Sequence, residues 1–344
     1  MRILPIITTL SIVGASCSDA VTFYSTNKLT QSGDSTTRYA GSSRAWDTDP
    51  NWELKPGTAA ANQDTNGDND PYAKSGNELV IQPGHLILSH RNKKNSSTVW
   101  QCDRVRLHGS IAAGQKQETT STFNADIHVE GNESSWLIGD FPTTVNGTGK
   151  LLLGKKDILF NQISSGSAGS LHFELPIIGD GTVSFKYIDN SIGSLHFSEI
   201  TQEFTGTFDA SLGNDVTLRF SENSDTSKAT LQLGRKKGDR HLKLNLAGSL
   251  HFHKVAIQDV VLASGSYSYH QLIELGTSKG LNFANNLIDN GGTLTVGTSA
   301  AAPSPAGKRT PASANTTPAA AKDTIPDGHS LLNIGGVVFK LSTH

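Results

Sequence analysis

The pentapeptide Gly-Ser-Leu-His-Phe occurs three times, at residues 169–173, 193–197 and 248–252. In each copy a leucine and a phenylalanine flank a histidine, so that large apolar side chains alternate with polar ones. Because successive side chains of a β-strand point to opposite faces, this alternation predicts a strand with one buried face and one solvent-facing face. The repeat therefore predicts a fold that is built from similar strands.

The spacing of the copies indicates how these strands are stacked. The first two copies begin 24 residues apart (169 to 193), which is about the length that three short strands and their turns require. Glycine-rich turns also precede alternating strands at residues 147–153, 179–185 and 291–297. We predict an all-β fold, a right-handed parallel β-solenoid with an N-terminal cap, and a β-sandwich array is the alternative. The 55 residues between 193 and 248 are expected to hold two rungs and an insertion.

Composition supports this fold class. Of the 344 residues, 35% are hydrophobic and 17% are charged, and the aliphatic residues form short clusters that end at Gly, Asn, Asp or Ser. The formal net charge of -2 gives no reason to expect a nucleic acid as partner. After residue 20 we find no apolar run that is long enough to span a bilayer.

Residues 1–20 have the pattern of an export signal. Arg2 precedes an apolar run over residues 3–13, and Ser18 and Ala20 occupy the small-residue positions of a cleavage site. We predict a cleaved signal peptide, so that the protein is secreted or at the cell surface. A lipid anchor on Cys17 is the alternative, although Gly14 stands where a lipobox has a leucine-like residue. Cleavage leaves Cys102 as the single cysteine, which excludes an intrachain disulfide.

The remaining chain divides by composition. We assign residues 21–78 to the N-terminal cap with an acidic loop and residues 79–298 to the solenoid. Residues 299–324 are rich in Pro, Ala and Thr, which predicts a disordered linker. Residues 325–344 form a C-terminal tail, in which residues 331–341 are expected to add a short strand.

The acidic loop is the part of the sequence with metal-binding character. Asp64, Asn66, Asp68 and Asp70 occupy alternate positions, as the oxygen ligands of a calcium loop do. The pattern is incomplete, because Ser75 stands where a bidentate acid is expected. Weak Ca²⁺ binding and a solvated acidic turn are the two interpretations.

Two groups of residues are candidates for binding a carbohydrate. The tryptophans Trp46, Trp52 and Trp100 offer indole faces on which a sugar ring could stack, although Trp46 and Trp52 equally suit the apolar cover of a solenoid end. A basic turn with Arg235, Lys236 and Lys237 could hold an anionic polysaccharide, whereas such turns are more often simply solvated.

The histidines of the repeat have two interpretations. If Leu171 and Phe173 fill the interior, His172 faces solvent and needs no chemical role. Alternatively, His251 and His253 share one face and could chelate a metal together with His172 or His196 from a neighbouring rung. No carboxylate or cysteine accompanies them at metal-site spacing, and no motif of a known catalytic type occurs.

Several segments resemble exported bacterial proteins with autotransporter-associated β-strand repeats, of the planctomycete and verrucomicrobial type. The similar segments are "AWDTDPNW", "NELVIQPGHLILS", "FTGTFDASLGNDVTLRF" and the stretch from "SGSYSYHQLIELG" to "NGGTLTVG", so that the resemblance covers residues 40–298. It implies a right-handed β-solenoid outside the cell and transfers no catalytic residue. The usual C-terminal sorting signal is missing from this sequence, which favours release over anchoring.

These observations favour a secreted, non-catalytic β-solenoid that acts as a cell-surface, extracellular-matrix or adhesion component. The alternative is a carbohydrate-active protein, either a polysaccharide-binding module or a lyase-like or hydrolase-like enzyme on a β-helix. The expected partners are extracellular polysaccharides or cell-surface components.

Overall fold

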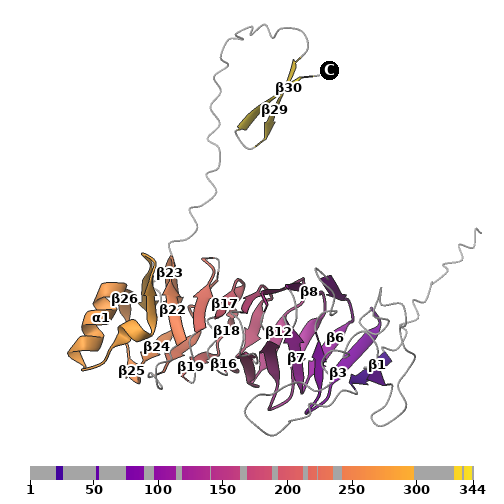
Figure 1. Ribbon diagram of the computed structural model, residues 1–344, viewed down its shortest axis with the longest axis horizontal. Coiled ribbons are helices and arrows are strands. Elements are labelled where there is room, and N and C mark those ends of the chain that lie inside the picture. The colour runs from indigo at the N-terminus through magenta and orange to yellow at the C-terminus, as the bar shows by residue number, and fades with distance from the viewer. Residues whose placement is uncertain are drawn as a thin grey trace, which may run out of the picture. The chain divides into compact units, whose positions relative to one another are not determined.

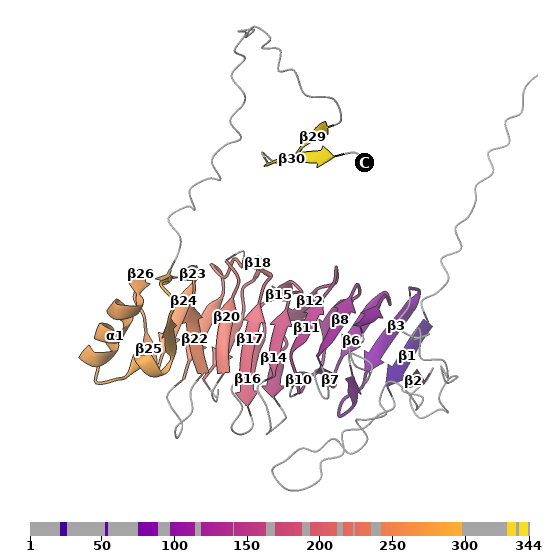
Figure 2. The same ribbon diagram turned by 45° about the horizontal axis from the view of Figure 1, so that its top comes forward.

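A computed structural model describes residues 21–25, 52–53, 75–88, 97–113, 118–139, 141–162, 169–187, 193–211, 216–222, 224–234, 242–297, 329–334 and 337–342. The chain forms two units, residues 1–299 and 300–344. In the first unit, three long sheets wind around a common interior, as Figures 1 and 2 show. We call them sheets I, II and III.

Sheet I contains, in spatial order, β2 (Trp52–Glu53), β1 (Val21–Ser25), β3 (Asn77–Ile81), β6 (Arg104–Leu107), β9 (Asp126–Val129), β12 (Leu151–Gly154), β15 (Ile177–Gly179) and β18 (Ile200–Phe204). Sheet II contains β4 (Leu86–Leu88), β7 (Ser110–Ala113), β10 (Ser135–Ile138), β13 (Ile158–Gln162), β16 (Thr182–Tyr187), β19 (Thr207–Ala210), β21 (Thr230–Leu233), β24 (Lys254–Ile257) and β25 (Val260–Val261). Sheet III contains β5 (Ser97–Trp100), β8 (Thr119–Phe123), β11 (Thr143–Asn146), β14 (Ser170–Phe173), β17 (Gly193–Phe197), β20 (Val216–Phe220), β22 (Leu242–Leu246) and β27 (Leu287–Asp289).

The chain visits the three sheets in rotation, which confirms the predicted β-solenoid. From β3 to β20, each set of three consecutive strands contributes one strand to each sheet. Strands of sheet II from β4 to β24 begin at residues 86, 110, 135, 158, 182, 207, 230 and 254, which is a step of 23 to 25 residues. Neighbours in these stacks are parallel, and antiparallel pairs occur only where β2 and β25 join the ends of sheets I and II. The predicted right-handedness and the N-terminal cap stay predictions.

The interior is filled by the alternating apolar side chains. Leu171, Phe173, Leu195 and Phe197 are all at most 1% exposed, as the alternation in the repeat predicts. A continuous series of aromatic contacts runs along the axis from Trp100 to Phe252, with centroid distances between successive rings such as 5.3 Å for Trp136–Phe173 and 5.0 Å for Phe208–Phe220. The described coils therefore share one continuous apolar core.

The glycines of the Gly-x-Gly turns lie at corners where consecutive coils approach closely. A Cβ atom on Gly181 would lie 1.8 Å from the carbonyl oxygen of Lys156, and one on Gly206 would lie 2.0 Å from that of Gly181. Both distances are far below van der Waals contact, so only glycine fits at these corners. This packing explains why glycines recur at the solenoid step.

The third copy of the repeat differs from the expected arrangement. The first two copies are β14 and β17, which are neighbours in sheet III with His172 opposite His196. The third copy is β23 (Ser249–Phe252), which belongs to a separate sheet with β28 (Thr293–Val296) and β26 (Gly265–Ser268). Between residues 193 and 248 the chain adds β20 and β22 to sheet III, which gives the two predicted rungs. The predicted insertion stays a prediction, because residues 235–241 between β21 and β22 lie outside the described residues.

A short helix, which the sequence analysis did not predict, lies at the C-terminal end of the solenoid (Figure 1). Helix α1 (Tyr269–Ser278) begins with a capping box, in which Ser268 accepts a bond from the Gln271 backbone and the Gln271 side chain accepts one from the Ser268 backbone. The 3-10 helix η1 (Phe283–Asn285) follows, and both Leu272 and Phe283 are completely buried in the core. The signal was present in the sequence as Ser-x-x-Gln before an apolar pattern.

Two predicted boundaries can be compared with the structure. Strand β1 pairs in parallel with β3, Val21 opposite Asn77, so the parallel stack begins within the region that was assigned to the cap. In the second unit, β29 (His329–Ile334) and β30 (Val337–Ser342) form an antiparallel pair, where we expected one strand. The predicted signal peptide and the linker at residues 299–324 lie outside the described residues.

Candidate functional site

Most of the residues that the sequence suggested as binding sites lie outside the described residues. This applies to the calcium-loop residues Asp64, Asn66, Asp68 and Asp70, to the basic turn Arg235, Lys236 and Lys237, and to Trp46. The backbone of Trp52 forms β2, and its side chain is not described. Weak calcium binding and carbohydrate binding by these residues therefore stay predictions.

Trp100 does not fit the predicted role in sugar binding. Its side chain is completely buried, and its indole ring stacks on Phe123 with a centroid distance of 4.9 Å. A buried indole cannot present a face to a sugar from solvent. Successive side chains of β5 point to opposite faces. Val99 is 44% exposed, so the next side chain, Trp100, points into the core.

The histidine cluster that was considered as a metal site is not assembled. His172 and His196 are adjacent in sheet III, whereas His251 lies on β23 in another sheet. The imidazole of His251 contacts the carbonyl oxygen of Gly297, with 2.7 Å between Nε2 and O. Within the described residues, no three His, Cys, Asp or Glu side chains are grouped as metal ligands.

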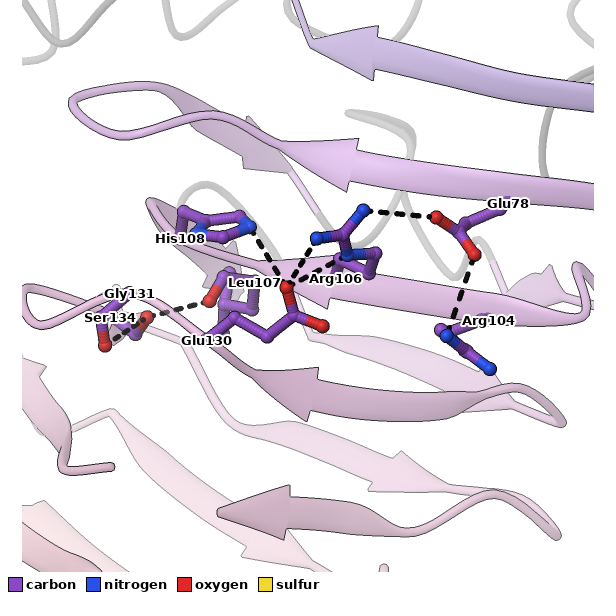
Figure 3. Close-up of polar contacts among 8 residues, drawn as sticks. All are labelled: Glu78, Arg104, Arg106, Leu107, His108, Glu130, Gly131 and Ser134. Carbon is purple, nitrogen blue, oxygen red and sulfur yellow. Dashed lines mark hydrogen bonds and ion pairs between the residues drawn. The ribbon is translucent and has the colours of Figure 1, made fainter. Parts of the chain in front are cut away.

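Two groups of charged side chains on the outside of the solenoid were not singled out from the sequence. The first, the sheet I cluster, consists of Glu78, Arg104, Arg106, His108 and Glu130 (Figure 3). The Arg106 guanidinium lies between both carboxylates, with Nη2 2.7 Å from Glu130 Oε2 and Nη1 3.4 Å from Glu78 Oε1. Arg104 contacts Glu78 at 3.7 Å, and His108 contacts Glu130 at 3.3 Å.

The charges of the sheet I cluster neutralise one another. The hydrogen bond from Arg106 lowers the pKa of Glu130, and the same bond raises the pKa of Arg106. His128, in register with Arg106 on the next strand, has a pKa lowered by burial and by the charge of Arg104. Because each carboxylate already accepts bonds from a guanidinium, the cluster joins β3, β6 and β9 and leaves little charge for a ligand.

The second group is a row of side chains on the outer face of sheet III, which we call the basic column. It consists of His172 on β14, His196 on β17, Arg219 on β20 and Lys243 on β22. His172, His196 and Arg219 occupy the same register on consecutive strands, and Lys243 lies opposite Thr217 on the fourth strand. Figure 2 shows these four strands side by side.

The basic column is accessible and is not neutralised by the described residues. His172 and Arg219 are exposed, and His196 and Lys243 are half-buried. The two imidazole rings have a centroid distance of 5.3 Å. Burial, together with His172 and Arg219, lowers the pKa of His196. The ion pairs found among the described residues all belong to the sheet I cluster.

Hydroxyl and amide groups lie beside the histidines and on the preceding strands of this face. Ser170 and Ser194 are hydrogen-bonded through their Oγ atoms at 3.0 Å, and Thr122 donates to Asn146 at 2.7 Å. Within sheet III, the strands β5, β8, β11, β14, β17, β20 and β22 contain no Asp or Glu. From β5 to β22 the outer face of sheet III is therefore polar and basic, with carboxylates at corners that follow the strands, such as Glu174, Glu199 and Glu222, whereas Asp289 lies in the last strand, β27.

Register is the signal that could have indicated the histidine row of the basic column and part of the sheet I cluster. Aligning the sequence at the solenoid step places the two histidines in one row and Glu78, Arg104 and Asp126 in another. The histidine pair was visible in the sequence, but Arg219 required knowledge that β20 follows β17 without a shift. The individual steps vary by several residues, so the sequence alone does not fix this register.

Comparison of the chain with protein-family models, with curated proteins and with solved structures finds no significant match. Among the described residues, no helix is both long enough and apolar enough to cross a membrane. The resemblance to exported proteins with autotransporter-associated repeats stays a prediction.

Proposed function

We propose that the protein is a secreted, non-catalytic β-solenoid that serves as a cell-surface, extracellular-matrix or adhesion component. The observation that carries this proposal is the combination of a filled interior with long outer faces on which polar side chains repeat in register. A stack of this kind offers an extended surface rather than a deep pocket, which suits contact with polymers and cell surfaces.

The predicted export signal supports the extracellular part of the proposal. The full chain, expressed in a bacterial host, is expected to reach the cell exterior and to begin at Val21 when its N-terminus is sequenced. A control variant with Ile6→Arg and Ile7→Arg interrupts the apolar run and is expected to stay inside the cell. Recovery of the unaltered chain only from the cytoplasm, with Met1 or Arg2 at its N-terminus, would contradict the proposal.

A polysaccharide-binding module is the second candidate, and the hydroxyl-rich outer face of sheet III favours it. The purified chain is incubated with a panel of polysaccharides, and retention and new reducing ends are measured together. Retention without new ends is the result that we expect for a binding module. The appearance of new ends would show an enzyme and would overturn the non-catalytic assignment.

A further inference from the structure

The two charged groups on the solenoid differ in whether their charges are satisfied. In the sheet I cluster, the side chains of Arg104, Arg106 and His108 each contact a carboxylate oxygen within 4 Å. In the basic column, no described carboxylate forms an ion pair with His172, His196, Arg219 or Lys243. The positive charges of Arg219 and Lys243 are therefore left to solvent or to a bound anion.

The geometry of the column indicates the shape of a suitable anion. Neighbouring strands are about 4.8 Å apart, so the column presents cationic or protonatable groups at regular intervals along the solenoid axis over four strands. A single small anion would reach only one or two of these groups. A linear polymer with regularly spaced charges can contact all of them.

The neighbouring side chains indicate the class of polymer. Ser170, Ser194, Thr217 and Thr144 border the column, and hydroxyl groups of this kind donate to and accept from sugar hydroxyls. The strands of this face present no aromatic side chain to solvent between β14 and β22, because their phenylalanines are buried. Binding of single-stranded nucleic acid commonly uses exposed aromatic side chains on which bases stack. The face therefore fits a carbohydrate better than a nucleic acid.

We propose that the basic column of sheet III is a binding site for a linear acidic polysaccharide, which lies along the solenoid axis with its carboxylates against Arg219, Lys243 and the two histidines. This site rests on the proposed extracellular role, because it identifies the partner that such a surface component would hold. The site is distinct from the basic turn at residues 235–237 that the sequence suggested.

The histidines make this binding dependent on pH. Histidine side chains gain their positive charge between about pH 8 and pH 5. Two side chains lie next to the two histidines in the same register. Arg219 on β20 is charged and lies opposite His196, and Thr144 on β11 is uncharged and lies opposite His172. Glu174 and Glu199 lie at the corners that follow β14 and β17, and no ion pair joins either to the column. The pKa of His196 is lowered by burial and by its neighbours, so its protonation adds positive charge to the column below the ordinary value of 6.5, and binding of a polyanion strengthens as the pH falls below that value.

The test measures binding of the full chain to immobilised polygalacturonate, which carries a carboxylate on each sugar unit, at pH 5.5 and pH 7.5. We expect Arg219→Gln with Lys243→Gln to weaken binding about tenfold, which corresponds to about 1.4 kcal/mol. The control variant, Lys150→Gln with Lys254→Gln, removes the same charge from exposed positions at the other sheets and should change binding less than about twofold. A variant with Arg219→Lys and Lys243→Arg keeps both positive charges and should retain binding. Retained binding in this variant would show that the weaker binding of the glutamine variant is due to the loss of charge.

Further arms of the experiment distinguish the alternatives. Replacing both histidines, with His172→Gln and His196→Gln, should remove the tighter binding at pH 5.5. Equal losses in the sheet III variant and in the control variant would overturn the site, as would absence of binding to polygalacturonate at pH 5.5. Equal binding to neutral dextran would exclude charge recognition, and tighter binding to a single-stranded oligonucleotide would assign the face to nucleic acid.

Failure of this site and failure of the proposed function can be told apart. If the chain is exported but the sheet III variant binds polygalacturonate as the unaltered chain does, the site is wrong and the surface role stands. If the chain stays inside the cell, the proposed function is wrong whatever the binding assay gives.

Discussion

The sheet I cluster and the basic column of sheet III lie on the same solenoid and differ in how their charges are used. In sheet I, Arg106 is held between Glu78 and Glu130, so that opposite charges alternate on consecutive strands. In sheet III, the permanently charged Arg219 and two groups that become positive only when protonated, His172 and His196, lie in one row without a carboxylate between them. The first arrangement stabilises the stack, and the second leaves charge available at the surface. The same stacked strands can thus present either a surface that stabilises the fold or a surface that binds a ligand. Which of the two forms depends on the charges of the outward-facing residues on neighbouring strands.

The largest expected effect sharpens the difference between the two faces of one strand. Leu195→Ala on β17 removes a completely buried side chain and is expected to lower the free energy of unfolding by about 2 to 5 kcal/mol. His196→Ala, one residue later, is expected to change it by less than about 0.5 kcal/mol. Urea denaturation of both variants measures the contrast. A larger loss in the histidine variant would mean that the outward assignment of the column is wrong.

The next effect concerns the sheet I cluster. Glu130→Gln keeps the size of the side chain and removes the charge that Arg106 and His108 contact. Because these groups are partly exposed, we expect a loss of about 1 to 2 kcal/mol, which is below the value for a fully buried charged hydrogen bond. Denaturation at pH 7 in low salt measures it. An unchanged stability would show that the cluster is not structural.

The same carboxylate gives a pH dependence with a definite sign. The folded state lowers the pKa of Glu130, so its contribution is complete above the ordinary pKa of 4.5 and is lost as the pH falls through the lower, folded value. The stability difference between the original chain and Glu130→Gln should therefore be present at pH 7 and shrink below about pH 4. A difference that grows towards acid pH would contradict this cause.

A smaller effect separates the third copy of the repeat from the first two. His251 contacts the Gly297 carbonyl oxygen at 2.7 Å, whereas the His196 imidazole makes no such contact with a described residue. His251→Ala is expected to cost about 1 kcal/mol, which exceeds the loss for His196→Ala. Thermal unfolding of the two variants side by side tests the order. Equal losses would mean that the separate sheet of β23 gives its histidine no special role.

The smallest effect is the titration of His196. Its pKa is lowered in the folded state, first by burial and then by His172 and Arg219. The unfolded chain therefore takes up this proton more readily, and stability is complete above the ordinary pKa of 6.5 and decreases as the pH falls through that value towards the folded pKa. His196→Gln should reduce this decrease between pH 8 and about pH 5.5. If the stability of the variant decreases with falling pH as much as that of the original chain, another group is responsible for the decrease.

The alternation within the pentapeptide was enough to predict the solenoid and the burial of Leu171, Phe173, Leu195 and Phe197. Strand alternation and the step between the first two copies are local properties, so the sequence carries them directly. The third copy misled the prediction because the same five residues can form a strand in any sheet of the coil. Which sheet they join depends on the lengths of all the preceding turns, and those vary from coil to coil.

The binding residues were harder to predict than the fold. Trp100 suggested a sugar platform by residue type, whereas its register buries it against Phe123. The basic column, in contrast, consists of ordinary residues at positions 172, 196, 219 and 243, which lie 23 or 24 positions apart along the chain. Only the pairing of neighbouring strands brings His172, His196 and Arg219 into one row with Lys243 beside it, and this pairing is a tertiary property.

The most direct test of the account compares Arg106→Gln with Arg219→Gln, because each removes one guanidinium from the outside of the same solenoid. Both variants are measured for free energy of unfolding and for binding to polygalacturonate at pH 5.5. We expect Arg106→Gln to lower stability by about 1 to 2 kcal/mol and to leave binding unchanged, whereas Arg219→Gln should weaken binding severalfold and leave stability within about 0.5 kcal/mol. If Arg219→Gln destabilises the chain while binding is unaffected, or if Arg106→Gln weakens binding as strongly as Arg219→Gln does, the division between a structural cluster and a binding column is wrong.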